Sequence, residues 1–302
     1  MLVTLSKLLT KVVMMRCRPR YEAILSRDQF GFRRNSGTID AIFCIKQLVS
    51  KKQETIHGLF LDLRGAFDLI DRDQMFRTRE LQLQSEKAVK LLRAYCETTI
   101  GKIRGGVNEF NIFSGVRQGA EESSPCFNVF FNYVLAVVER DMRAELGECG
   151  VDFDFNILSE SNPRGLMGTG KANGKTKIWK MLYADDLVFL DTDWSRLEKT
   201  LEIVNRVFKK YGLIIAADKT KSLTFNPTEP PPRPLPLEAL EQSENGIFSP
   251  PGALRPRTPK FIGRLESFLA QFGSDNPEIK HPRDGGNTHH FSPLLRCHPQ
   301  KS

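Results

Sequence analysis

Two adjacent aspartates, Asp185 and Asp186, stand between two apolar runs that are rich in β-forming residues. The runs are Met181–Ala184 before the pair and Leu187–Leu190 after it. This pattern predicts a hairpin whose turn carries both carboxylates. Carboxylates crowded at one turn repel each other unless a cation or solvent compensates their charge. A solvated turn is the simpler interpretation of an isolated pair, but the apolar flanks favour a central hairpin with an Mg²⁺ site at its end.

A third carboxylate, Asp62, lies within the apolar run His57–Leu63, which predicts a buried strand. A carboxylate in such a strand is costly unless it is paired or binds metal. If this strand lies beside the hairpin in one antiparallel sheet, Asp62 comes next to Asp185 and Asp186. Three such carboxylates form the protein half of a two-metal site for in-line phosphoryl transfer.

Composition sets broad limits on the class of protein. The 302 residues are 40% hydrophobic, enough for a sizeable core in one large or two small domains. A formal charge of +8 fits a polyanionic partner, and equally fits a merely basic globular protein. Six cysteines without C-x-x-C spacing indicate neither a disulfide framework nor a zinc ribbon, so we expect reduced thiols in an intracellular protein without membrane spans.

The remaining pattern predicts elements on both sides of these strands. Apolar spacing and turn residues predict helices over 5–13, 39–49, 74–83, 86–97, 126–146 and 197–208, a hairpin over 98–116, a polar surface insertion over 148–177, and a strand, turn and strand over 213–225. We expect Pro19 to limit the first helix, Ser36 or Thr38 to cap the second, and Ser123 or Ser124 to cap the helix that ends at Leu146.

The character of the chain changes at Pro227. Fourteen of the seventeen prolines lie from this residue onward. We therefore predict a domain boundary here, followed by a Pro-rich tail of low order over 227–302 with one short helix, Phe261–Phe272.

Three motifs occur in a telling order along the chain: Phe60–Asp68, Gly115–Gly119 and Tyr183–Asp186. They resemble motifs A, B and C of reverse transcriptases, particularly those of non-LTR (LINE-like) retrotransposons. Gln29–Arg33 is similar to the fingers motif that precedes them, and Gly212–Lys221 is similar to motif D.

The resemblance covers residues 1–226. It implies an α+β fold, with the fingers and palm of a right-hand polymerase and an antiparallel palm sheet. It also implies RNA-directed DNA polymerase activity, with two Mg²⁺ ions as cofactors and an RNA template, a DNA primer and deoxynucleoside triphosphates as partners. The family's priming at chromosomal DNA implies a nuclear location.

The resemblance also assigns catalytic roles. Asp62, Asp185 and Asp186 would be the catalytic metal ligands, with the backbone carbonyl of Leu63 as a further ligand. Lys219 matches the motif D lysine that would protonate pyrophosphate. Lys221 is a near competitor for that role, and an ordinary turn lysine is the alternative for Lys219.

Three further residues would bind the nucleotide. Arg33 would reach the triphosphate, Phe67 would lie under the sugar as a steric gate against a 2′-hydroxyl, and Gln118 would line the pocket. A core aromatic is the structural alternative for Phe67, and a solvated loop arginine for Arg33. The sequence departs from the family after Gln118, where Ala120–Pro125 replaces a run close to Cys-Pro-Leu-Ser-Pro. Its two glutamates would repel phosphate unless they point away from the nucleotide channel.

Three rival interpretations follow from the same residues. An RNA-directed RNA polymerase shares paired aspartates, but the aromatic residue at Phe67 and the Tyr-Ala before the acids argue against it. A catalytically inactive retrotransposon remnant would bind nucleic acid through positive charge alone, in a salt-sensitive and Mg²⁺-independent manner. A pseudogene product would show no cooperative unfolding.

Overall fold

The fold is built on a four-stranded antiparallel sheet with the strand order β6-β7-β1-β8. The strands are β1 (Ile56–Leu61), β6 (Lys180–Tyr183), β7 (Asp186–Asp191) and β8 (Lys221–Phe225). This computed structural model describes residues 4–52, 54–83, 86–97, 99–102, 108–117, 119–156, 173–228 and 235. The predicted central hairpin and its neighbouring strand are confirmed, since β7 pairs with both β6 and β1.

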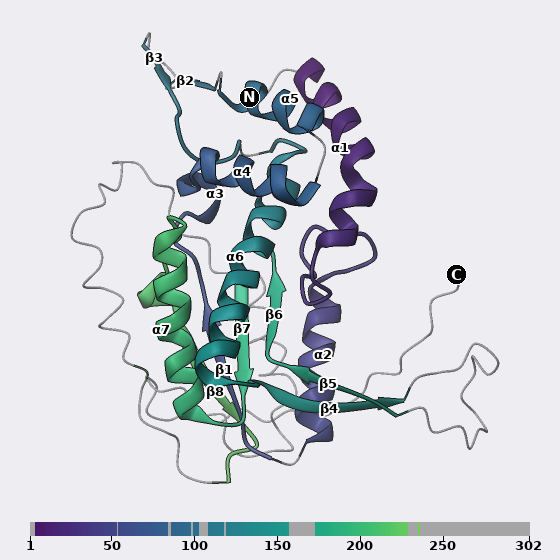
Figure 1. Cartoon of the computed structure of the whole chain (residues 1–302), viewed down its shortest axis with the longest axis vertical. Helices are drawn as coiled ribbons and strands as arrows, with labels where there is room; N and C mark the ends of the chain where they lie inside the picture. The colour runs from purple at the N-terminus through teal and green to yellow at the C-terminus, as the bar shows by residue number, and fades with distance from the viewer. Residues whose placement is uncertain are drawn as a thin grey trace, which may run out of the picture.

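Helices cover both faces of this sheet because its central strands are apolar on both sides. Leu59 and Leu61 of β1 join a core with α6 (Ser123–Leu146) and α7 (Trp194–Lys210). Phe60, which points to the opposite face, joins a second core with α2 (Thr38–Lys51). Figure 1 shows α6 and α7 running along one side of the sheet.

The remaining helices gather at one end of the sheet, the upper end in Figure 1. These elements are α1 (Thr4–Ile24), α3 (Ala66–Leu69), α4 (Arg72–Leu83), α5 (Glu86–Glu97) and the hairpin of β2 (Ile100–Lys102) and β3 (Glu109–Asn111). A second hairpin, β4 (Val151–Asn156) with β5 (Asn173–Ile178), extends from the other end. Within the described part of the chain, no helix is both long enough and apolar enough to cross a membrane.

The helix boundaries correct three predictions. Helix α1 continues through Pro19 to Ile24, because the buried side chains of Tyr21 and Leu25 beyond the proline offset the hydrogen bond that it removes. The N-cap of α2 is Gly37, whose N–H donates to Asp40 Oδ2 at 2.6 Å. Neither predicted hydroxyl residue therefore caps this helix.

The cap of α6 was also predicted wrongly. Glu122 occupies the N-cap position, and α6 begins at Ser123. The hydroxyl of Ser123 donates to the carbonyl of Arg117 at 2.6 Å and so holds the preceding loop. The predicted boundary at residue 227 stays a prediction, and the predicted order of the tail and its helix fall outside the described residues.

Candidate active site

The three predicted aspartates emerge at the same end of the sheet. In the β1–β7 pairing Leu61 lies opposite Leu187, so continuing the register by one residue brings Asp62 across from Asp186. Of the two carboxylates predicted for the turn, Asp185 lies between β6 and β7, whereas Asp186 is the first residue of β7. Asp62 is only 5% exposed, and Asp186 is similarly buried. The sheet therefore brings the three aspartates to one end of its two central strands.

The carboxyl group of Asp185 has a perturbed pKa. Burial raises the pKa of Asp185 to about 6, and the negative charge of Asp62 adds to the rise. A backbone hydrogen bond and the positive charge of Lys219 partly oppose it. Asp62 and Asp185 are therefore close enough to repel each other, which is the electrostatic condition under which a bound cation is favourable.

Lys219 provides a positive charge at this end of the sheet. It lies at the end of the short helix η1 (Ala217–Lys219), and its Nζ is 2.8 Å from Asp62 Oδ2. The two atoms form an ion pair, and Asp62 Oδ2 makes no aligned hydrogen bond. Of the two candidate lysines, Lys219 is thus the one that the structure brings to Asp62.

Main-chain hydrogen bonds hold this lysine segment against the end of β1. Arg64 N donates to Ile214 O at 2.8 Å, and Ala216 N donates to Asp62 O at 2.9 Å. These two bonds form an isolated antiparallel bridge between Leu63 and Ile215. Neither bond involves the carbonyl of Leu63, which is the group predicted to be an additional metal ligand.

The residues at this end of the sheet fit a divalent cation in their negative charge and in their oxygen ligand atoms. The buried oxygen Oδ2 of Asp62 faces the Lys219 ammonium without an aligned hydrogen bond, and a bound cation would offset the burial that raises the pKa of Asp185. Carboxylate oxygens are ligands that Mg²⁺ prefers. Among the described residues, however, no group of three or more His, Cys, Asp or Glu side chains is arranged so that it could hold a metal ion.

The predicted nucleotide-binding residues have separate environments. Arg33 donates from Nε to Glu22 Oε2 at 3.1 Å and from Nη1 to Ser26 O at 2.7 Å. The structure thus joins Arg33 to the end of α1 and not to the aspartates. Gln118 lies outside the described residues.

Phe67 belongs to an aromatic group beside the site. Its ring stacks on Phe127 of α6, with 4.4 Å between centroids, and meets Phe32 edge-on at 6.2 Å. Phe67 is only partly buried, while Phe127 is fully buried. The ring is therefore held firmly from the core side, as either a steric gate or a core aromatic would be.

The unusual glutamates after motif B point in different directions. Glu122 is 1% exposed, and its Oε1 accepts from Arg117 Nη2 at 3.0 Å, while Glu121 is exposed. The guanidinium of Arg117 lies over the ring of Tyr95, 3.5 Å from its centroid. The charge of Glu122 is therefore neutralised inside the protein, which removes the expected repulsion of phosphate for this residue.

One residue of the site was missed as a functional candidate. Gln29, within the fingers motif, accepts from Ala184 N at 3.1 Å and donates from Nε2 to Ala184 O at 3.2 Å. Ala184 directly precedes the paired aspartates. The only sequence signal was that Gln29 lies within the fingers motif, in which only Arg33 was assigned a role.

Comparisons with known proteins agree with this geometry. Residues 1–264 match the family described as reverse transcriptase (RNA-dependent DNA polymerase). The chain is 24% identical over 223 residues to the "Retrovirus-related Pol polyprotein from type-1 retrotransposable element R2" of Popillia japonica. This match covers 73% of the chain and 28% of the relative, so the chain spans little more than a quarter of that polyprotein.

Solved telomerase structures share the fold. An apo telomerase from Candida tropicalis truncated from the C-terminal domain has a TM-score of 0.51 at 12% identity, over 73% of this chain and 41% of that one. The telomerase from the same organism in complex with a TWJ fragment of telomeric RNA has a TM-score of 0.51 at 13% identity, over 88% and 41% of the two chains. These likenesses confirm the predicted α+β fingers-and-palm fold.

Proposed function

Because the chain belongs to the reverse transcriptase family, we propose that it is the polymerase core of an R2-like, non-LTR retrotransposon and catalyses RNA-directed DNA synthesis. The proposal rests on the sheet register that places Asp62 across from Asp186, with Asp185 in the adjoining turn and Lys219 paired with Asp62 at the same end of the sheet. Repulsion between buried acids costs stability in a purely structural role, whereas the cations of a phosphoryl-transfer site would offset it.

The proposed cofactor is a pair of Mg²⁺ ions. Asp62, Asp185 and Asp186 would hold them, with the carbonyl of Leu63 as a further ligand. When bound, the ions would activate the primer 3′-hydroxyl and stabilise the charge that develops on the leaving pyrophosphate.

Lys219 has two tasks in this proposal. Its ammonium group offsets the charge of Asp62 across 2.8 Å. Its side chain is 25% exposed, so it can also turn outward and donate a proton to the departing pyrophosphate. Loss of Lys219 would therefore affect both the stability of the site and the release of pyrophosphate.

The remaining predicted residues would select and bind the nucleotide. Phe67, backed by the stacked ring of Phe127, would lie under the sugar and exclude a 2′-hydroxyl. Gln118 would line the same pocket. Arg33 would bind the triphosphate only after exchanging its contacts with Glu22 and Ser26.

The proposed partners are an RNA template, a DNA primer and deoxynucleoside triphosphates. The formal charge of +8 supports a polyanionic partner. A related fold in a telomerase solved with telomeric RNA supports RNA as one of them. Priming at chromosomal DNA would place the protein in the nucleus.

Primer extension tests this proposal. Purified protein would be given an oligo(dT) primer on poly(rA), dTTP and Mg²⁺, with a chelator control. The wild type and Asp154→Asn, a surface carboxylate on β4, should extend the primer, and Asp185→Asn should not. Absence of extension by a cooperatively folding wild type would contradict the proposal, as would undiminished extension by Asp185→Asn.

A further inference from the structure

We propose that Gln29 is a positioning residue for the turn that leads into the paired aspartates. Its side-chain amide would hold the Ala184 backbone in an unfavourable conformation and so determine where Asp185 and Asp186 stand. The inference rests on the proposed role of those two aspartates in catalysis.

The amide of Gln29 satisfies both polar backbone groups of one residue. Gln29 is 4% exposed, and its Oε1 accepts from Ala184 N while its Nε2 donates to Ala184 O. Both backbone groups of Ala184 are thus bound to a side chain that comes from 155 residues earlier in the chain. A single primary amide is suited to this task because it offers an acceptor and a donor side by side.

The conformation of Ala184 explains why such a support is needed. Its φ is +62°, in the left-handed region that residues with a Cβ rarely adopt. A residue persists in such a conformation when its surroundings determine it, and these residues cluster at functional sites. Here the left-handed residue directly precedes Asp185, so its conformation sets the direction in which the next carboxylate leaves the turn.

Gln29 is itself held by the main chain around it. Phe30 N donates to Leu182 O at 2.8 Å, and Leu182 N donates to Asp28 O at 2.9 Å. These bonds flank Gln29 and attach its segment to strand β6, which leads into the turn. The amide therefore acts from a fixed base.

Gly31 and Asn128 add a second layer to this support. A Cβ atom on Gly31 would lie 2.2 Å from Ala184 N, so only glycine allows the two backbones to approach this closely. The carbonyl of Gly31 accepts from Asn128 Nδ2 of α6 at 2.9 Å, and Gly31 N donates to Gln29 Oε1 at 2.8 Å. The turn, the fingers motif and α6 are thereby linked through buried hydrogen bonds.

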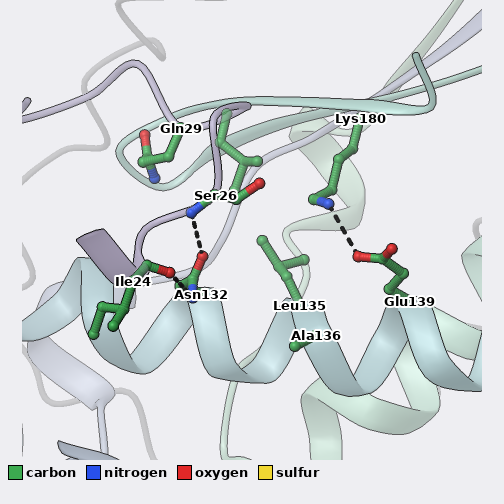
Figure 2. A pocket seen from close by; sticks show the side chains of 9 residues that line it. Ile24, Ser26, Gln29, Asn132, Leu135, Ala136, Glu139 and Lys180 are labelled. Atoms are coloured by element: carbon green, nitrogen blue, oxygen red, sulfur yellow. Dashed lines mark hydrogen bonds and ion pairs between the residues drawn. The ribbon is translucent and has the colours of Figure 1, made fainter. Parts of the chain in front are cut away.

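The chain offers a matched control for Gln29. Asn132 of α6 holds a neighbouring segment in the same manner, since its Oδ1 accepts from Ser26 N at 2.8 Å and its Nδ2 donates to Ile24 O at 3.1 Å. Figure 2 shows these contacts beside Gln29 in a pocket that none of the three aspartates lines. Asn132→Leu should therefore remove a comparable pair of hydrogen bonds without disturbing the turn.

The test compares Gln29→Met, which keeps the length of the side chain and removes both hydrogen bonds, with Asn132→Leu. The first measurement is hydrogen exchange of the Ala184 amide by NMR. We expect exchange to become about fivefold faster or more in Gln29→Met, because the lost hydrogen bond protected it, and to stay unchanged in Asn132→Leu. The second measurement is steady-state primer extension, in which kcat should fall roughly ten- to hundredfold in Gln29→Met with little change in KM for dTTP.

Equal protection of the Ala184 amide in the wild type and Gln29→Met would overturn the proposal, and so would an equal loss of kcat in both variants. If Gln29→Met does not fold, Gln29→Glu replaces it and is assayed at alkaline pH, because an ionised glutamate keeps the acceptor for Ala184 N and has no donor for Ala184 O. For Gln29→Glu we expect the same fall in kcat, and an unchanged kcat would refute the role of the donor. If the wild type itself extends no primer, the proposed function fails, while the exchange measurement still decides whether Gln29 holds the turn.

Discussion

Replacing Asp185 by asparagine should stabilise the metal-free protein, and only above a definite pH. The pKa of Asp185 is raised from its ordinary value of 3.8 to about 6, chiefly by burial. At 1.36 kcal/mol per pKa unit, this difference corresponds to a destabilisation of the folded state of about 3 kcal/mol when the carboxyl is ionised. Part of the side chain remains exposed to solvent, so this figure is an upper bound.

The sign of the effect follows from proton binding in the two states. Below about pH 4 the carboxyl is protonated in both the folded and the unfolded protein, and its ionisation costs nothing. Between about pH 4 and pH 6 the unfolded chain has lost the proton while the folded protein retains it, so stability falls as the pH rises. Above about pH 6 the cost is complete. Asparagine cannot ionise and should escape this cost.

Urea unfolding with a chelator present measures the difference. At about pH 7.5 Asp185→Asn should unfold with a free energy up to about 3 kcal/mol above that of the wild type, and at about pH 4.5 the two should differ by less than about 1 kcal/mol. Asp154→Asn serves as the exposed control. A difference that is independent of pH, or a destabilised Asp185→Asn at neutral pH, would refute the electrostatic reasoning.

Three further substitutions test other contacts of the site. Lys219→Met leaves the carboxylate of Asp62 without its ion-pair partner and should lower the free energy of unfolding by about 1 to 3 kcal/mol, measured in urea. Gly31→Ala should cost about 1 to 3 kcal/mol and most of the extension activity, because its Cβ meets the backbone of the turn. Gly37→Ala, whose Cβ has 3.7 Å to its nearest neighbour, should keep the extension activity and lose no more than the roughly 1 kcal/mol that alanine costs at a helix N-cap. Glu122→Gln breaks a buried ion pair and should destabilise by about 3 kcal/mol, and an unchanged urea midpoint would show that this pair is not needed for stability.

The central sheet could be predicted because its sequence signals are local. Apolar runs around Asp185 and Asp186 indicated the hairpin, and the cost of a carboxylate in an apolar strand singled out Asp62. The order of the three motifs along the chain then indicated the family, and the family resemblance indicated the other candidate residues of the site. Packing confirmed the pattern, since alternate residues of β1 enter two separate cores.

Other features could not be predicted because they depend on distant partners. Gln29 acts on a residue that lies 155 positions away, and no local pattern marks a side chain that binds a remote backbone. Pro19 was predicted to end the first helix, but the helix continues because burial of Tyr21 and Leu25 outweighs the one backbone hydrogen bond that the proline removes. The β4–β5 hairpin was hidden because its strands lie in a stretch that is polar overall.

The side-chain contacts around the proposed site could not be predicted from the sequence. The sequence proposed two lysines for one role, and only the ion pair with Asp62 distinguished Lys219 from Lys221. It left the direction of Glu122 open, which the buried contact with Arg117 decides.

Calorimetry of Mn²⁺ binding, in the presence of primer, template and deoxynucleoside triphosphate, tests whether the three aspartates form the metal site. We expect two bound ions per chain in the wild type and in Asp154→Asn, and weaker or fewer bound ions in Asp62→Asn and Asp185→Asn, because these aspartates are the proposed ligands. Equal Mn²⁺ binding in all four proteins would contradict the claim that the carboxylates at this end of the sheet form the metal site of a polymerase.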